Sequence, residues 1–283
     1  MGFGLDKLGQ WTDGPEFTVE ADRVKAYAAA TNDPIAAHRN GTIAPPVVAV
    51  VPVWDTMITA MAGVVPPEVV AMVVHGEQDM WFHAPIRPGM VLKTTAAPVG
   101  VHVKPNGTSV IAKVATSDQD GTLLVEQYMT SFFRGVSEGE SAGEEAPDHA
   151  LDASVKSREP EAVVVQQVDT DQTFRYSEAS GDMMPMHLDD AFAKSVGLPG
   201  IIIHGLCTMA FTSWAAIENV AGGDPARLKR LAVRFSKPVL PGQEITTNIW
   251  ATGERAGNTV YGFETANPDG ELVIKAGLAE IAP

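Results

Sequence analysis

The sequence contains an internal duplication, and this feature limits the possible folds more than any other. The segment Tyr27-Ala-Ala-Ala-Thr-Asn-Asp33 aligns with Tyr176-Ser-Glu-Ala-Ser-Gly-Asp182, and His38 and His187 each follow the aspartate by five residues. Further on, the segment from Phe82 to Gly89 aligns with that from Phe235 to Gly242. The offsets are 149 and 153 residues, so one series of elements occurs twice in the same order.

The two halves are expected to be separate domains joined by a linker. A chain of 283 residues is long enough for two domains with cores of their own. We place the halves at residues 1–136 and 159–283, with an acidic linker at 137–158. The first part of the linker, Ser137–Pro147, has four glutamates and no basic residue. This composition is typical of a solvated connection.

Each half shows the same order of expected elements. Short helices are expected at residues 21–31 and 172–180, and long apolar helices at about 48–64 and 205–220. Runs rich in valine, threonine and aromatic residues then predict four strands per half. They lie at 78–82, 91–99, 109–117 and 122–133, and at 230–235, 244–251, 259–266 and 271–281. A mostly antiparallel sheet curled around one buried helix in each half predicts an α+β fold.

The charge and the cysteine content exclude several classes of function. The 20 basic and 35 acidic residues give a net charge of −15, which disfavours binding to nucleic acids or to an anionic membrane surface. The single cysteine, Cys207, excludes an intramolecular disulfide and CxxC-type sites, and we expect it to fill the core. The N-terminus does not have the pattern of a signal peptide. We therefore expect a cytoplasmic protein.

One apolar stretch needs a separate test for membrane insertion. Ser195–Ile217 contains 23 residues without a charged side chain, a length that can span a bilayer. Its first third contains Gly197, Pro199 and Gly200, which indicate a loop. We therefore expect a helix only over Gly205–Val220, buried in a protein core.

The segment from Ser180 to Asp190 holds the first candidate catalytic groups. Asp182 and His187 are five residues apart and would not share a face of a continuous helix. Pro185 lies between them and forbids an uninterrupted helix, so a tight loop is expected to bring the two side chains together. A carboxylate and an imidazole held in this way can activate a water molecule. A capped turn with a structural histidine is an equally open alternative at this point.

The second candidate feature is a glycine at the start of the long helix of the second half. Gly205 follows His204, and the backbone N–H groups of a first helical turn have no partner within the helix. An unbonded N–H at this place suits a developing oxyanion such as a thioester enolate. The alternatives are that Gly205 only permits close packing and that His204 is a buried core histidine.

The first half lacks the parts to repeat this chemistry. Pro45 and Pro46 occupy the position where a glycine should open the long helix, and proline has no N–H to donate. Asp33 and His38 are therefore expected to be structural or relics, and the first half to hold the bulky part of a ligand. The polar segment His75–Gln78 either lines a cleft or caps a helix end.

Other sites are either weak or absent in the sequence. Arg234 could meet a ligand phosphate or could be a solvated charge at a strand end. His187 and Asp189 have no third ligand at metal spacing, so we expect no metal. The sequence has no glycine-rich motif of the dinucleotide or P-loop type, and no cofactor is expected.

The motif from Tyr176 through Asp182, Pro185, His187 and Asp189, followed by His204-Gly-Leu-Cys-Thr208, resembles the MaoC-like, R-specific enoyl-CoA hydratases of the hydratase 2 group. The match runs to about residue 242, and the duplication extends it to a double hot-dog fold. This resemblance implies hydration of a trans-2-enoyl-CoA to a (3R)-3-hydroxyacyl-CoA without metal or cofactor. Asp182 and His187 would activate water, and the Gly205 N–H would stabilise the thioester oxygen.

The resemblance also implies a ligand-binding set and a homodimer. We expect His204, Met184 and Arg234 to contact an acyl-CoA, with a long or bulky acyl group such as a fatty acyl or steroid side chain. The acyl-CoA would enter between the halves. The chain departs from the family at Met184, where the family usually has asparagine, so a side-chain amide is lost. A hot-dog thioesterase and a non-catalytic acyl-CoA-binding subunit remain alternatives.

Overall fold

The computed structural model describes residues 2–283, and the chain divides into two compact units. Unit 1 contains the chain up to Thr18, then Pro52–Ala84 and Met90–Asp148. Unit 2 contains Val19–Val51, Pro85–Gly89 and His149–Pro283. Residues 19–51, which the duplication assigns to the first half, thus pack with the unit that holds the second half. The hot-dog boundaries at 136 and 159 stay predictions.

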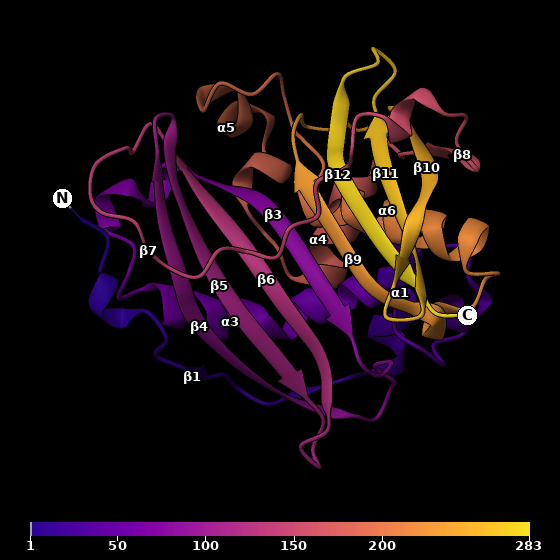
Figure 1. The fold of residues 1–283 in the computed structure, drawn as a ribbon, viewed down its shortest axis with the longest axis horizontal. Helices are drawn as coiled ribbons and strands as arrows, with labels where there is room; N and C mark the ends of the chain where they lie inside the picture. The colour runs from indigo at the N-terminus through magenta and orange to yellow at the C-terminus, as the bar shows by residue number, and fades with distance from the viewer. Residues whose placement is uncertain (1) are drawn as a thin grey trace. The chain divides into compact units, whose positions relative to one another are not determined.

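Unit 1 is an antiparallel sheet with a helical segment packed against it (Figure 1). The strands lie in the order β1-β4-β5-β6-β3, and the short β2 and β7 also pair with β4. Helix α3 packs against β4 and β5, where Ala60 meets Ala96 and Val114 in a buried cluster. The bounds are β1 Thr12–Asp13, β2 Phe17–Thr18, α3 Trp54–Met61, β3 Val73–Phe82, β4 Val91–Lys104, β5 Gly107–Ser117, β6 Leu123–Arg134 and β7 Ala142–Gly143. Short 3-10 turns lie at η1 Leu5–Lys7 and η3 Pro67–Met72.

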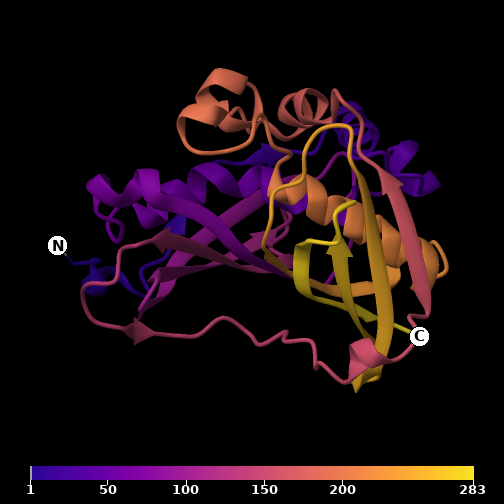
Figure 2. The same ribbon diagram turned by 90° about the horizontal axis from the view of Figure 1, so that it is seen from above.

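The strands of unit 2 are also antiparallel, in the order β9-β12-β11-β10-β8. Figure 2 shows helix α6, Gly205–Val220, lying within the curve of these strands. The helix packs against β8, β9, β10 and β12, and eleven of its side chains are buried. The bounds are β8 Ala162–Gln167, β9 Leu228–Phe235, β10 Glu244–Arg255, β11 Asn258–Ala266 and β12 Leu272–Ile281. The α+β hot-dog arrangement expected from the sequence is confirmed.

Four further helices of unit 2 lie before α6. They are α1 Ala21–Ala30, α2 Ala36–Arg39, α4 Gln172–Ser180 and α5 Asp190–Ser195. The 3-10 turns η4 Val155–Ser157 and η5 Pro185–His187 also precede α6, and η6 Pro225–Arg227 follows it. Helices α1 and α4 pack against each other. Arg23 Nε donates to the Ala179 carbonyl at 3.1 Å, and Gln172 Nε2 donates to the Ala30 carbonyl. The two donors, Arg23 and Gln172, are 149 residues apart, and so are the two acceptors, Ala30 and Ala179. The repeated helices therefore pack around a local two-fold axis.

The long helix expected at residues 48–64 is wrong. Pro46–Val53 forms a 3-10 helix, η2, and the α-helix α3 covers only Trp54–Met61. Pro52 lacks the N–H that an α-helix needs, and the valines at 47, 48, 50 and 51 lower helix propensity. In contrast, the expected helices at 21–31, 172–180 and 205–220 match α1, α4 and α6.

Three regions of the chain contain more regular structure than the sequence indicated. Strand β8 was not expected, and β3 begins at Val73, five residues earlier than expected. His75 and Gln78 therefore lie inside a strand, where His75 Nε2 is 3.1 Å from Gln78 Oε1, and they do not cap a helix. The acidic linker contributes β7, which pairs with β4.

Helix α6, which has 16 residues, is buried against the sheet of unit 2, as expected. No helix in residues 2–283 is both long and apolar enough to cross a membrane.

Candidate active site

The Asp182–His187 segment forms a tight bend after α4. Gly181 ends the helix in the left-handed conformation with φ of 85°, which glycine adopts without a Cβ penalty. Pro185 then opens the 3-10 turn η5, which ends at His187. Asp182 is fixed at both ends: its N–H donates to Ser180 Oγ at 3.2 Å, and its Oδ1 accepts from the Met184 N–H at 3.1 Å. The expected proline-broken loop is present.

His187 is held in one tautomer by a main-chain carbonyl. Its Nδ1–H donates to the Ile202 oxygen at 2.8 Å, which leaves Nε2 as the unprotonated nitrogen of a neutral ring. The side chain is buried, and burial lowers the pKa of His187, while the Ile202 bond and the Asp182 charge oppose this shift. The carbonyl of His187 itself accepts from the Thr173 hydroxyl at 2.9 Å. A neutral, oriented imidazole of this kind can act as a general base.

Asp182, His187 and His204 form one cluster. One nitrogen or carboxylate oxygen from each residue lies within 4.8 Å of the other two. Within residues 2–283 no hydrogen bond or ion pair joins the Asp182 carboxylate directly to either ring. Two hydrogen bonds of about 2.8 Å span such a gap, so one small polar molecule can bridge the carboxylate and an imidazole.

His204 lies behind His187 and is almost completely buried, with 1% of its surface exposed. The two rings stack with centroids 3.7 Å apart and planes 24° apart. His204 Nε2–H donates to the Asp182 carbonyl at 3.2 Å, and the hydroxyls of Ser177 and Thr173 lie 3.3 Å from Nε2 and Nδ1. Burial, assisted by His187, lowers the pKa of His204 to about 3, so the ring stays neutral.

Gly205 is the first residue of α6 and is partly exposed. Its N–H has no hydrogen-bond acceptor in the described part of the chain. A Cβ at this position would lie 3.2 Å from the ring of Phe235, so a larger residue would have to displace that ring. The N–H thus stands at the positive end of the helix dipole without an acceptor from residues 2–283.

Met184 and Arg234 lie in different surroundings. The Met184 side chain is 51% exposed, and its backbone N–H supplies a hydrogen bond to the Asp182 carboxylate. Arg234 lies in β9 beside Phe235 and opposite Lys275 of β12. Because successive side chains of a strand point to opposite faces, Arg234 is directed away from the face of the Phe235 ring. The roles of Met184 and Arg234 in binding stay predictions.

The structure brings three possible metal ligands together, which the spacing of His187 and Asp189 did not indicate. Their geometry is poor for one ion, because the lone pairs of the two stacked rings lie in separate, nearly parallel planes and do not meet at a common point. Tetrahedral coordination needs the two lone pairs to converge at a wide angle. Asp189 instead caps α5, with its Oδ1 accepting from the Phe192 N–H at 2.9 Å.

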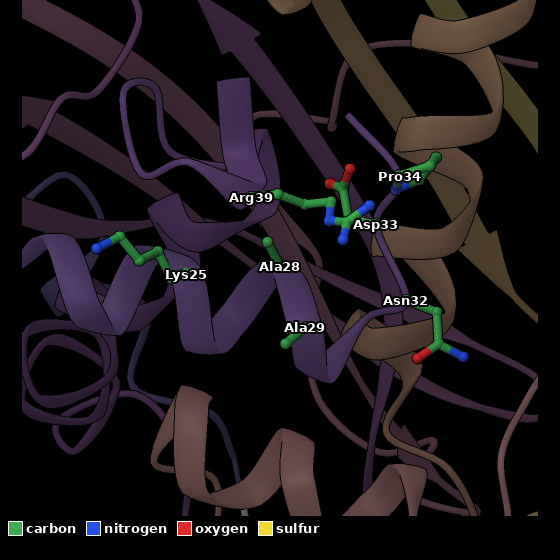
Figure 3. A pocket seen from close by; sticks show the side chains of 7 residues that line it. All are labelled: Lys25, Ala28, Ala29, Asn32, Asp33, Pro34 and Arg39. Atoms are coloured by element: carbon green, nitrogen blue, oxygen red, sulfur yellow. The ribbon is translucent and has the colours of Figure 1, made fainter. Parts of the chain in front are cut away.

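The corresponding residues of the first half form a closed pair. His38 Nδ1 lies 2.7 Å from Asp33 Oδ2, and Asp33 Oδ1 accepts from the Ile35 N–H at 2.8 Å. Both side chains are buried, and His38 Nε2 has no hydrogen-bond partner in residues 2–283. A pocket of about 540 Å³ lies next to this pair (Figure 3). It is lined by Lys25, Ala28, Ala29, Asn32, Asp33, Pro34 and Arg39.

Several residues that support the cluster were not found from the sequence. Thr173 and Ser177 face the cluster from one side of α4. Their spacing of four residues places them on one face of a helix, so the sequence could have indicated that they act together. Tyr176, which the sequence motif already contains, also packs here, with its ring 4.8 Å from that of His204 between centroids. Cys207 is buried, as expected, and burial raises the pKa of its thiol, so it is not a nucleophile of this site.

Two family models match the chain. The MaoC like domain matches residues 152–269, and the MFE-2 hydratase 2 N-terminal domain matches residues 37–135. A probable enoyl-CoA hydratase 2 of Dictyostelium discoideum is 32% identical over 213 residues, which are 75% of this chain and 71% of that protein. Other relatives, among them peroxisomal multifunctional enzymes, are longer, and this chain covers 26% to 30% of them.

Solved structures show the same fold. A MaoC-like dehydratase from Phytophthora capsici superposes with a TM-score of 0.84 at 25% identity, covering 99% of this chain and 97% of that one. A Mycobacterium tuberculosis protein described as a double hotdog fold gives a TM-score of 0.62 at 14% identity, covering 98% and 97% of the two chains. The chain therefore belongs to the MaoC-like dehydratase and hydratase 2 family and has its double hot-dog fold.

Proposed function

We propose that this protein catalyses the reversible hydration of a trans-2-enoyl-CoA to a (3R)-3-hydroxyacyl-CoA, without a metal or a cofactor. The observation that carries the proposal is the open arrangement of Asp182 and His187, whose polar atoms lie within 4.8 Å without an ion pair in the described chain. This gap suits one bridging water. The relationship to an enoyl-CoA hydratase 2 supports the same reaction.

The reaction begins with polarisation of the thioester. The Gly205 N–H donates to the thioester carbonyl oxygen, which draws electrons from the double bond and makes C3 electrophilic. His187 Nε2, which is unprotonated because Nδ1–H is bound to Ile202, removes a proton from the water as its oxygen bonds to C3. Negative charge then rests on the thioester oxygen as an enolate. The proton returns from Nε2 to C2, so H and OH have been added and the imidazole is neutral again.

Asp182 orients the water and stabilises the imidazolium that forms on His187. Its Oδ1 is fixed by the Met184 N–H, so one carboxylate oxygen has a defined direction. This main-chain bond does not depend on the side chain at position 184, so it is kept although the usual asparagine is replaced by methionine. The departure at Met184 is therefore compatible with an active site that keeps both catalytic groups.

We further propose a long or bulky acyl group as the substrate. Met183 and Met184, which directly follow Asp182, are 62% and 51% exposed, and they present apolar surface beside the reacting centre. Arg234 is proposed to meet a phosphate of the CoA. Arg234→Ala should then raise KM and leave kcat unchanged.

The decisive experiment measures loss of the enoyl-thioester absorbance by the purified protein over a series of chain lengths. Product analysis should give the (3R) alcohol, and turnover should increase with acyl length or bulk. A thioesterase would instead release a free thiol, which a thiol reagent detects. An acyl-CoA-binding subunit would bind the thioester in a calorimeter and consume none, and either result would replace the hydratase proposal.

We also propose that the protein is a cytoplasmic homodimer. Sedimentation at micromolar concentration should give twice the chain mass, and cell fractionation should recover the protein with cytoplasmic markers. A monomer would contradict the proposed dimer, and recovery in another compartment would contradict the proposed cytoplasmic location.

A further inference from the structure

We propose that His204 is a positioning residue that holds Asp182 and His187 apart, so that the pair stays open for water. This inference rests on the proposed hydratase function for its catalytic consequence. It gives His204 a role behind His187 instead of the substrate contact expected from the sequence, because only 1% of its surface is exposed.

The contacts of His204 fix both catalytic residues at once. Its ring covers one face of His187 at 3.7 Å, which stops that ring from tilting toward the carboxylate. Its Nε2–H holds the Asp182 main-chain carbonyl at 3.2 Å, which fixes the backbone of the aspartate. The Thr173 hydroxyl lies 3.3 Å from Nδ1 of His204, and its proton is donated to the His187 carbonyl. One imidazole therefore sets the positions of two residues that are five apart in the chain.

The first half shows the same pair without such a residue. Asp33 and His38 repeat the spacing of Asp182 and His187 at an offset of 149 residues. At the position of His204-Gly205 the first half has Pro45-Pro46, which can neither stack as an imidazole nor donate a hydrogen bond. There the imidazole and the carboxylate bond directly at 2.7 Å, and no gap remains. The two halves thus compare an open and a closed pair within one chain.

The groups that face His204 allow it to act as an uncharged spacer. They are His187 and the Asp182 carbonyl from the loop, and Thr173, Tyr176 and Ser177 from α4. Burial raises the pKa of Tyr176, so this neighbour is neutral too. On α1, Arg23 donates to the carbonyls of Ala179 and Ser180, the last two residues of α4. A neutral ring does not compete with His187 for the Asp182 charge.

The test compares His204→Ala with His204→Phe, which keeps a stacking ring and loses the hydrogen bonds. For His204→Ala we expect kcat to fall about 100-fold with KM nearly unchanged, because the pair closes and water is displaced. The pKa of His187, followed by NMR of its ring protons, should rise as it pairs directly with Asp182. His204→Phe should recover part of kcat and keep the pKa of His187 low.

A matched control is His149→Ala, which removes another buried histidine that bonds a main-chain carbonyl through Nδ1. It should leave the pKa of His187 unchanged. If His204→Ala fails to fold, NMR of His204→Phe and of the wild type still decides. In His204→Phe the ring is kept, so a His187 pKa that rises to the value of a histidine paired directly with an aspartate would contradict the spacer role of the ring. An unchanged pKa of His187 in folded His204→Ala overturns the proposal. The NMR readout needs no turnover, so it separates this proposal from a failure of the hydratase function.

Discussion

The hydroxyl groups of Tyr27 and Tyr176 lie 3.0 Å apart in a buried contact between α1 and α4. The two residues are 149 positions apart, which is the offset of the first repeat. In a homodimer with two-fold symmetry, a residue on the axis meets its own copy. The pair therefore has the form of an ancient subunit contact that became internal when the two copies joined in one chain. It also relates Asp33 and His38 to Asp182 and His187 by the same symmetry.

The catalytic assignment predicts a large loss of activity in two separate variants. Asp182→Asn removes the charge that orients water and stabilises the imidazolium, and His187→Ala removes the base. Each should lower kcat by about 1,000-fold or more. Steady-state kinetics measures this loss, and circular dichroism should show an intact fold. Near-native turnover in both variants would contradict the assignment.

A second prediction concerns the N–H of Gly205. In Gly205→Ala the new methyl group meets the Phe235 ring at 3.2 Å, so the first turn of α6 or the ring must shift. We expect kcat to fall about 10- to 100-fold, because the donor no longer points at the thioester oxygen. Adding Phe235→Leu creates space and should restore part of the rate. If Gly205→Ala alone has wild-type kcat, the oxyanion role is wrong.

The closed pair of the first half is predicted to serve stability rather than chemistry. Asp33→Asn and His38→Phe each break a buried interaction of 2.7 Å and should lower the free energy of unfolding by about 3 kcal/mol. Chemical denaturation measures this change. At a temperature where both variants are folded, kcat should stay within a factor of about 3 of wild type. A loss as large as that of Asp182→Asn would instead make the first pair catalytic.

The pH profile follows from the direction of the His187 shift. Burial lowers the pKa of His187 below its ordinary value of 6.5, and the proposed base is the neutral ring. Activity should therefore persist below pH 6.5 and fall only as the pH drops through the lowered pKa. A kcat/KM profile measures the acidic limb. An apparent pKa at or above 6.5 on this limb would contradict a buried neutral base.

Cys207 is predicted to be unreactive in the folded protein. It is fully buried, and burial raises the pKa of the thiol, so the reactive thiolate is absent. A thiol reagent should modify no cysteine in the native protein and one per chain in denaturant. Because Cys207 does not react, a thiol reagent in the assay for thioesterase activity detects only the released CoA. Rapid modification under native conditions would show that α6 opens.

The sequence alone determined the order of the expected elements, the three helices α1, α4 and α6, and the bend that carries Asp182 and His187. These features depend on local physics. Apolar periodicity and a glycine start define α6, and Pro185 forbids a helix between Asp182 and His187. The repeat itself was visible because matched residues keep the same spacing, and the contacts between α1 and α4 repeat at that offset.

The sequence misjudged the regions where local signals conflict. The valine-rich stretch before α3 looks like a long apolar helix, but Pro52 and the β-branched residues favour a 3-10 helix over Pro46–Val53. Strand β8 is short, and only its pairing with β10 along the edge of the sheet makes it a strand. The secondary structure of such segments depends on pairing with strands that are distant in the chain, and a single sequence does not show which strands pair.

The tertiary structure alone decided how His187 and His204 lie relative to each other. His204 is 17 residues from His187 in the chain, yet the rings stack at 3.7 Å because α6 begins directly behind η5. The same separation of five residues gives a closed pair at Asp33 and an open one at Asp182. Spacing limits which groups can meet, but their distance and protonation depend on the neighbours that folding places around them.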